Sequence, residues 1–84
     1  MATKGSNRAR ELIVEAVENQ IRKNDPLEAR ETLDRLIQSG QSREEALRPI
    51  AGVLANEMFE VMQSKSHFHN ARYVANLERL PKLP

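Results

Sequence analysis

Three short interruptions divide the sequence into four segments of helical periodicity, and this division limits the possible folds more than any other feature. The interruptions are residues 24–26, 39–42 and 63–67, which are rich in Asn, Asp, Pro, Gly and Ser. No segment shows the strict alternation of apolar and polar residues that a half-buried strand needs. The sequence therefore predicts an all-α protein, a compact bundle of four helices.

The first helix is expected over residues 7–23. One of its faces carries Glu11, Glu15 and Glu18, which are neighbours because residues three and four apart lie on one side of a helix. Carboxylate metal sites in helical bundles add histidine in a Glu-x-x-His pattern, which the sequence lacks, so we expect a solvated acidic face. The apolar side chains that should face inward are Ala9, Leu12, Ile13, Ala16, Val17 and Ile21.

The second helix is expected from Pro26 to about Ser39. Asp25 should cap its first turn, with Glu28 three residues later completing a capping box. Gly40 should end the helix, because only glycine takes the left-handed conformation there without a Cβ penalty. The side chains expected to face inward are Ala29, Leu33, Leu36 and Ile37.

The third helix is expected to begin at Arg43, after a capping box formed by Ser42 and Glu45. Pro49 lies inside this helix, and its missing N–H and bulky ring predict a kink or break there. Gly52 is expected to admit the close approach of another helix, which would compensate for its low helix propensity. The apolar positions cover more than one stripe, which predicts a central helix: Ala46, Leu47, Ile50, Ala51, Val53, Leu54, Ala55, Met58, Phe59, Val61 and Met62.

A short fourth helix is expected from about Asn70 to Leu80. His69 or Asn70 should cap its start, and Phe68 just before it is placed as a hydrophobic staple. Pro81 cannot continue the helix and should end it. The apolar face of this helix consists of Tyr73, Val74, Leu77 and Leu80.

The length of 84 residues corresponds to one small domain, expected over residues 7–80, with a flexible N-terminus (1–6) and a frayed C-terminus (81–84). Cysteine is absent, so no disulfide can form. The chain has neither a leader-like apolar segment nor the roughly 20 apolar residues that span a bilayer, so we expect a cytoplasmic protein that does not enter the membrane. A chain of this size buries only about 60–65% of its unfolded surface, so a partner subunit would stabilise it.

Several of these helical stretches occur together in a recognisable combination: residues 17–20, 42–47, 51–61 and 71–74. In this combination the chain resembles a family of small, uncharacterised, all-helical bacterial proteins. The resemblance covers most of residues 10–80 and rests on helix-forming motifs. It implies an all-α fold and brings no activity with it.

A metal centre is the first kind of site to consider. Members of that family carry histidines in the first helix and around the start of the third, whereas Val14, Glu44 and Arg48 stand at the matching positions here. His67 and His69 supply two donors in a loop, and zinc sites need three or four ligands. We therefore expect neither a metal nor a cofactor, and metal binding through His67 and His69 stays open as an alternative.

Catalysis is not expected either. A nucleophilic Ser or Thr needs an adjacent base and a group that orients it, and the Ser and Thr residues of this chain lie in caps, loops and the second helix. The sequence has no Gly-x-Ser-x-Gly motif and no glycine-rich phosphate loop. The chain is therefore predicted not to be an enzyme.

Nucleic-acid binding is an alternative function. The second and third helices are compatible with a helix-turn-helix whose recognition helix begins at Arg43, but Glu44 and Glu45 would then face the DNA backbone. The formal charge is +3 over residues 1–10, −5 over 11–62 and +3 over 63–84. A helical hairpin inside a bundle explains the same turn, which leaves weak binding through the basic termini: Lys4, Arg8, Arg10, Arg72, Arg79 and Lys82.

The breadth of the apolar surface on the third helix is the most informative functional feature. Either the other helices cover it on all sides, or an apolar patch remains for a second copy or another protein. Methionine suits adaptable binding surfaces because its side chain is flexible and polarisable. We therefore predict a small interaction or assembly module, with a homodimer and a complex with another protein both open. The group expected to face a partner or the edge of the core is Met58, Phe59, Met62, Phe68 and Tyr73.

Overall fold

Helices account for all regular structure in the computed structural model, which describes residues 3–65 and 67–82 and the side chains from residue 8 onward. The four helices are α1 (Thr3–Lys23), α2 (Leu27–Gln38), α3 (Arg43–Ser64) and α4 (Asn70–Arg79). They pack against one another and the described residues contain no strand. The predicted all-α bundle is confirmed.

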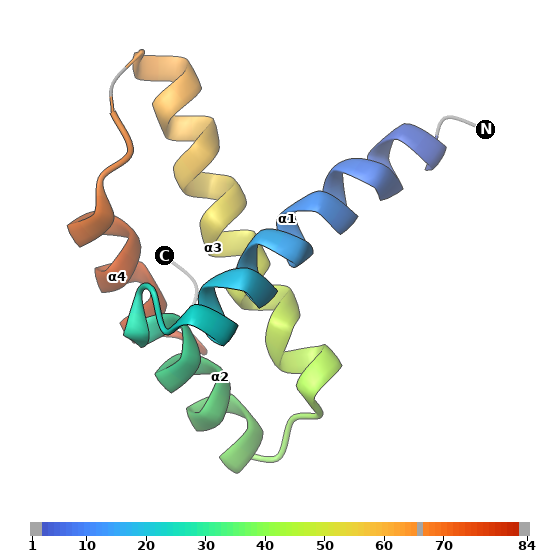
Figure 1. Cartoon of the computed structure of the whole chain (residues 1–84), viewed down its shortest axis with the longest axis vertical. Coiled ribbons are helices and arrows are strands. Elements are labelled where there is room, and N and C mark those ends of the chain that lie inside the picture. The colour runs from blue at the N-terminus through green and yellow to red at the C-terminus, as the bar shows by residue number, and fades with distance from the viewer. Residues whose placement is uncertain (1–2, 66, 83–84) are drawn as a thin grey trace.

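The third helix is the centre of the arrangement, since α1, α2 and α4 all pack against it. α2 in turn packs against α1 and α4, which closes the lower part of the bundle. Figure 1 shows that α1 crosses α3 near its middle and that the two helices then diverge. The first half of α1 and the second half of α3 therefore form the two limbs of a V.

The core lies below this crossing, where all four helices contribute side chains. Ala9, Leu12 and Ile37 were expected to face inward and are exposed instead. Ala9 and Leu12 are exposed because the first half of α1 extends beyond the bundle, out of reach of the other helices (Figure 1). The buried apolar side chains are Val17, Ile21, Ala29, Leu33, Leu36, Ala46, Leu47, Ile50, Ala51, Val53, Leu54, Tyr73, Leu77 and Leu80.

The turn between α1 and α2 differs from the prediction. Asn24 takes the left-handed conformation (φ 54°), and the Asp25 N–H donates to the Gln20 carbonyl over 3.0 Å, which closes the end of α1. Pro26 then lies in extended backbone as the residue that precedes α2, and no side chain caps this helix. The predicted capping box of Asp25 and Glu28 is therefore wrong, because Asp25 belongs to the end of α1.

The turn between α2 and α3 agrees with the prediction. Gly40 has a φ of 111°, and the following Gln41 N–H donates to the Leu36 carbonyl over 3.2 Å. The Ser42 hydroxyl accepts from the Glu45 N–H (3.1 Å), while the Glu45 carboxylate accepts from the Ser42 N–H (2.9 Å). The capping box at the start of α3 is confirmed.

The middle of α3 differs in part from the expectations. The helix continues through Pro49 as one element from residue 43 to residue 64, so of the predicted kink or break the break is absent. Burial of Leu47 and Ile50 on either side of Pro49 offsets the lost backbone hydrogen bond. Gly52 is exposed, and no atom lies within 4 Å of the place its Cβ would take. The expected close approach at Gly52 is therefore wrong.

The ends of the chain follow the prediction in part. α1 begins at Thr3, so residues 3–6 are helical rather than a separate segment, while residues 1–2 and 83–84 lie outside the described part. α4 begins at Asn70 with His69 as its N-cap residue, but the His69 side chain makes no capping hydrogen bond. The rings of Phe68 and Tyr73 meet edge to face at 5.5 Å and 67°, which confirms the hydrophobic staple.

The far end of α4 is held by α2. The Arg35 guanidinium donates to the carbonyls of Leu77 (3.0 Å) and Leu80 (3.1 Å) at the C-terminal end of α4. The Thr32 hydroxyl also donates to the Leu77 carbonyl over 3.4 Å. A cation at a helix C-terminus also interacts favourably with the helix dipole.

Tyr73 provides a direct test of this packing, because it is the only tyrosine in the chain. Its side chain is fully buried and its hydroxyl donates to Gln20 of α1 over 2.6 Å. Burial raises the pKa of the Tyr73 hydroxyl to about 12 from its ordinary value of 10, although the hydrogen bond to Gln20 acts in the opposite direction.

We expect tyrosinate absorbance to appear only near pH 12 in the folded protein and near pH 10 after unfolding in urea. Because the folded state holds its proton longer, stability should fall by up to about 1.4 kcal/mol per pH unit between these two values. Tyr73→Phe is the control that removes this contribution. A folded-state midpoint near pH 10 would contradict the burial of Tyr73.

Candidate functional site

Three large apolar side chains on the second half of α3 are exposed. Met58, Phe59 and Met62 are 45%, 55% and 75% exposed. At about 100° per residue they share one face of the helix with Gly52 and Ala55, turned away from the core. We call these five residues the outer face of α3. Glu57 and Glu60 lie on other sides of the helix, so the face is apolar along its length.

A second apolar strip lies on the first half of α1. Ala9, Leu12, Ile13 and Ala16 follow the i, i+3, i+4, i+7 spacing of a helix face that packs against a neighbour. Ala9 is exposed, Leu12 is 53% exposed, and Ile13 and Ala16 are half-buried. We call these four residues the arm stripe. Its pattern predicts a packing partner. Ile13 and Ala16 pack partly against the core, and Ala9 and Leu12 are left uncovered.

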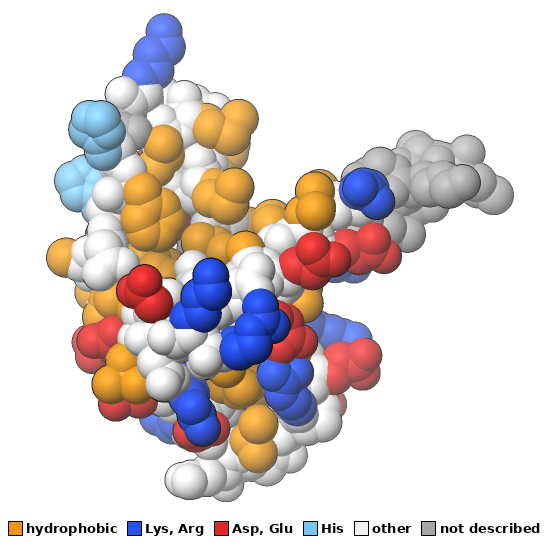
Figure 2. Space-filling view, viewed as in Figure 1, with side chains coloured by type: hydrophobic (Ala, Val, Ile, Leu, Met, Phe, Trp, Pro, Cys, Tyr) orange, Lys and Arg blue, Asp and Glu red, His pale blue; other side chains and the backbone are white. Residues whose placement is uncertain are grey.

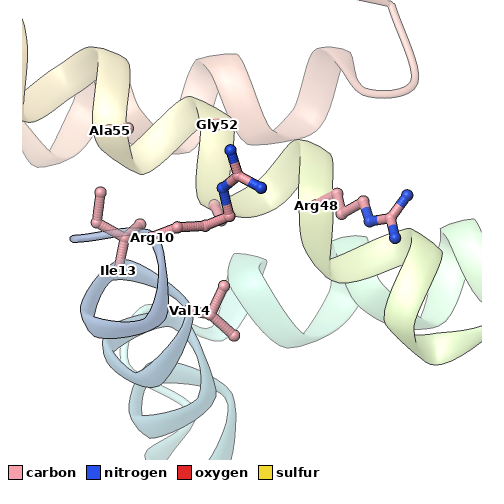
Figure 3. A pocket seen from close by; sticks show the side chains of 7 residues that line it. Arg10, Ile13, Val14, Arg48, Gly52 and Ala55 are labelled. Atoms are coloured by element: carbon pink, nitrogen blue, oxygen red, sulfur yellow. The ribbon is translucent and has the colours of Figure 1, made fainter. Parts of the chain in front are cut away.

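A groove of about 460 Å³ lies between α1 and α3 where they begin to diverge. Arg10 extends from α1 across it toward Gly52, while Arg48 on α3 points away along the opposite side (Figure 3). The groove exists because Gly52 and Ala55 have no bulky side chains to fill the space between the helices. Its lining is Arg10, Ile13, Val14, Arg48, Ala51, Gly52 and Ala55.

A smaller hollow of about 170 Å³ continues the apolar surface toward the end of α3. Met58, Val61 and Met62 line it from α3, and Phe68 lines it from the segment before α4. Figure 2 shows apolar side chains gathered on the limb that carries the end of α3, above the charged lower part of the molecule. The outer face of α3 thus extends to Phe68, which is 44% exposed.

The structure brings four of the five predicted partner-facing residues to this surface and places the fifth in the core. Met58, Phe59, Met62 and Phe68 are exposed, whereas Tyr73 is fully buried. Tyr73 packs its ring against Phe68 from below, so it supports the surface without being available to a partner.

The main polar feature near this surface is a buried carboxylate that the sequence analysis missed. Glu57 is 1% exposed, and its two oxygens accept from Nε (2.8 Å) and Nη2 (2.7 Å) of Arg72 in α4. The same carboxylate accepts from the backbone N–H of His69 over 3.1 Å and so replaces the missing side-chain cap of α4. The available signal was a glutamate at a core-facing position of α3, between Leu54 and Val61.

The hydrogen bonds from Arg72 hold the pKa of the Glu57 carboxyl below its ordinary value of 4.5, and they outweigh the opposite effect of burial. The His69 N–H lowers this pKa further. Glu57 therefore stays ionised and fixes the turn that carries Phe68. Its hydrogen bonds to Arg72 and to the His69 N–H give it a structural role, since they join α3 to the start of α4.

The other candidate groups do not converge on a site. Glu18 turns from the acidic face of α1 to Arg43 of α3, with hydrogen bonds of 2.6 and 3.0 Å that lower the pKa of the Glu18 carboxyl. His67 and His69 are exposed. Across residues 3–65 and 67–82, no three histidine, aspartate or glutamate side chains come close enough together to hold a metal ion.

The basic residues proposed for nucleic acid are also dispersed. Arg72 is engaged by Glu57, and Arg10 lies across the groove. The side chain of Lys4 lies outside the described residues. The remaining three are Arg8 on α1 and Arg79 and Lys82 at the end of α4, two regions that lie apart in Figure 1.

Comparisons with family models, curated proteins and solved structures find no match to this chain. None of the described helices is both long and apolar enough to cross a membrane. The surface formed by the outer face of α3, the groove and the arm stripe is the feature of the molecule that best indicates a function.

Glu57 generates a prediction about acid stability. Glu57→Gln should lower the free energy of unfolding by about 1–3 kcal/mol at neutral pH, because the amide cannot satisfy both Arg72 and the His69 N–H. The folded-state pKa lies below the unfolded value, so this stabilisation is present above about pH 4.5 and is lost as the pH falls through the folded-state pKa.

The difference between the two proteins should therefore shrink in acid, as measured by urea unfolding followed by circular dichroism. Glu60→Gln, on an exposed side of the same helix, is the matched control and should change little at any pH. A Glu57→Gln difference that stays constant from neutral pH down to full protonation would show that the charge of Glu57 does not stabilise the fold.

Proposed function

We propose that this chain is a small protein-assembly module that binds a helix along the outer face of α3. The observation that supports this function is an apolar face of helical length that the other described helices leave open. It has three large side chains between 45% and 75% exposed and hollows on both sides. Monomeric soluble proteins rarely expose contiguous apolar patches of this kind unless the patch is a binding surface.

The shape of the surface fits a helix better than a small ligand. Gly52, Ala55, Phe59 and Met62 recur at the three- and four-residue spacing by which one helix packs along another. The small residues at one end allow a close approach of backbones, and the methionines adapt to the shape of a partner. Amphipathic helices bind in grooves of this type through anchors at the same spacing.

The energetics also require a partner that covers several of these side chains together. Burying one Met or Phe contributes about 1.5–3 kcal/mol, whereas association costs about 4–15 kcal/mol in lost freedom. Met58, Phe59, Met62 and Phe68 must therefore be buried in one interface for binding to be stable. A helix of four or five turns reaches all four, because Met58, Met62 and Phe68 line one hollow and Phe59 follows Met58 in α3.

Met62→Glu tests this function. The substitution places a charge on the most exposed residue of the outer face and should abolish association, measured by sedimentation equilibrium of the pure protein and by affinity capture with the tagged chain. Met62 is 75% exposed, so the free energy of unfolding of the monomer should change by less than about 0.5 kcal/mol.

Ile37→Glu is the matched control, since Ile37 is 38% exposed on α2 and lies outside this surface. It should retain whatever partner the unmodified chain binds. Association that is equally strong in Met62→Glu, Ile37→Glu and the unmodified protein would rule out the outer face of α3 as the binding surface.

A further inference from the structure

The molecule carries two unpartnered apolar surfaces of complementary shape. The outer face of α3, with the groove beside it, is a concave receptor for a helix, and the arm stripe on α1 is the apolar side of a protruding helix. α1 and α3 diverge, so the two surfaces cannot fully cover each other within one chain (Figure 1). Building on the proposed function, we propose that the partner is a second copy of this chain, with the arm stripe of each copy lying along the outer face of α3 in the other.

The lengths of the two surfaces are similar. The arm stripe runs from Ala9 to Ala16, which at 1.5 Å per residue is about 12 Å. The outer face of α3 runs from Gly52 to Met62, which is about 16.5 Å by the same rule. One arm stripe therefore covers most of one outer face.

The surface area supports a partner of this size. A compact monomer of 9.6 kDa is expected to expose about 5,100 Å², whereas this chain exposes 6028 Å². The excess of about 900 Å² is close to the roughly 800 Å² that each partner buries in a standard interface. The radius of gyration of 12.8 Å likewise exceeds the value of about 11.8 Å expected for this length.

A two-fold dimer satisfies both surfaces at once. In such a pair the arm of the first copy binds the second and the arm of the second binds the first, so the assembly closes and neither surface remains free. The charges at the edges are mixed, because Arg8 and Glu15 border one side of the arm stripe, and Arg10 and Arg48 border the groove. Glu15 of one copy can therefore meet Arg48 of the other at the rim of an interface whose centre stays apolar.

Mixing two variants tests this arrangement more sharply than measuring the oligomeric state alone. Leu12→Glu damages the arm stripe and Met62→Glu damages the outer face of α3, and both positions are more than half exposed, so the fold is retained. In a dimer of two identical variant chains, both of the contacts between an arm stripe and an outer face of α3 are damaged. In the mixed pair, one contact carries both substitutions, and the other contact is intact.

We expect the unmodified chain to be a dimer at micromolar concentration, and each variant alone to have a dissociation constant raised at least about tenfold, equivalent to 1.4 kcal/mol. An equimolar mixture of the two variants should form a heterodimer that is tighter than either variant with itself. Sedimentation equilibrium with one variant fluorescently labelled measures this directly. Ile37→Glu should dimerise like the unmodified chain, and circular dichroism should show the same helix content in all variants.

Three results would overturn the proposal. A dimer that Met62→Glu dissociates and Leu12→Glu does not would show that the outer faces of α3 meet each other without the arm. A monomeric pure chain that captures a different protein, with capture lost in Met62→Glu and kept in Ile37→Glu, would exclude the second copy and leave the proposed function standing. If the chain neither self-associates nor captures any protein through this surface, both the dimer proposal and the proposed function are wrong.

Discussion

The buried carboxylate of Glu57 is the interaction on which the shape of the molecular surface depends. It joins the middle of α3 to the first turn of α4 through Arg72 and the His69 N–H, and in doing so it turns the chain sharply after α3. α4 is thereby held against the core side of α3, and Phe68 is fixed beside Met58 and Met62. A charged side chain at this position costs desolvation, which three strong hydrogen bonds offset. The opposite side of α3 is left without a covering helix.

Local chemistry accounts for the features that the sequence predicted correctly. The Ser42 capping box, the left-handed Gly40 and the staple between Phe68 and Tyr73 each connect residues no more than five positions apart. Their geometry is therefore determined by the residues themselves. Asp25 shows the limit of this reasoning, because the same residue can serve the start of one helix or the end of the helix before it. In the structure the Asp25 N–H donates to the Gln20 carbonyl, so Asp25 belongs to the end of α1.

Features that depend on distant parts of the chain could be predicted only in outline. The apolar excess on α3 was visible in the sequence, but whether a given side chain is covered depends on where the other helices lie. Tyr73 and Met62 have similar apolar character, yet one is fully buried and the other is 75% exposed. Gly52 faces open space for the same reason, since α1 diverges from α3 there. Periodicity identifies a face that packs and does not identify its partner.

The difference between having a packing face and having a partner for it explains why the arm stripe indicates assembly. Ile13 continues the i, i+4, i+8 spacing of the buried Val17 and Ile21, so the apolar side of α1 extends back beyond the part that the bundle buries. Within one chain only its second half finds a partner. A small domain gains little stability from its own core, and covering the first half of α1 would add apolar burial without lengthening the chain. If a second copy supplies that cover, folding and assembly draw on the same hydrophobic surface, and the stability of the fold rises with protein concentration.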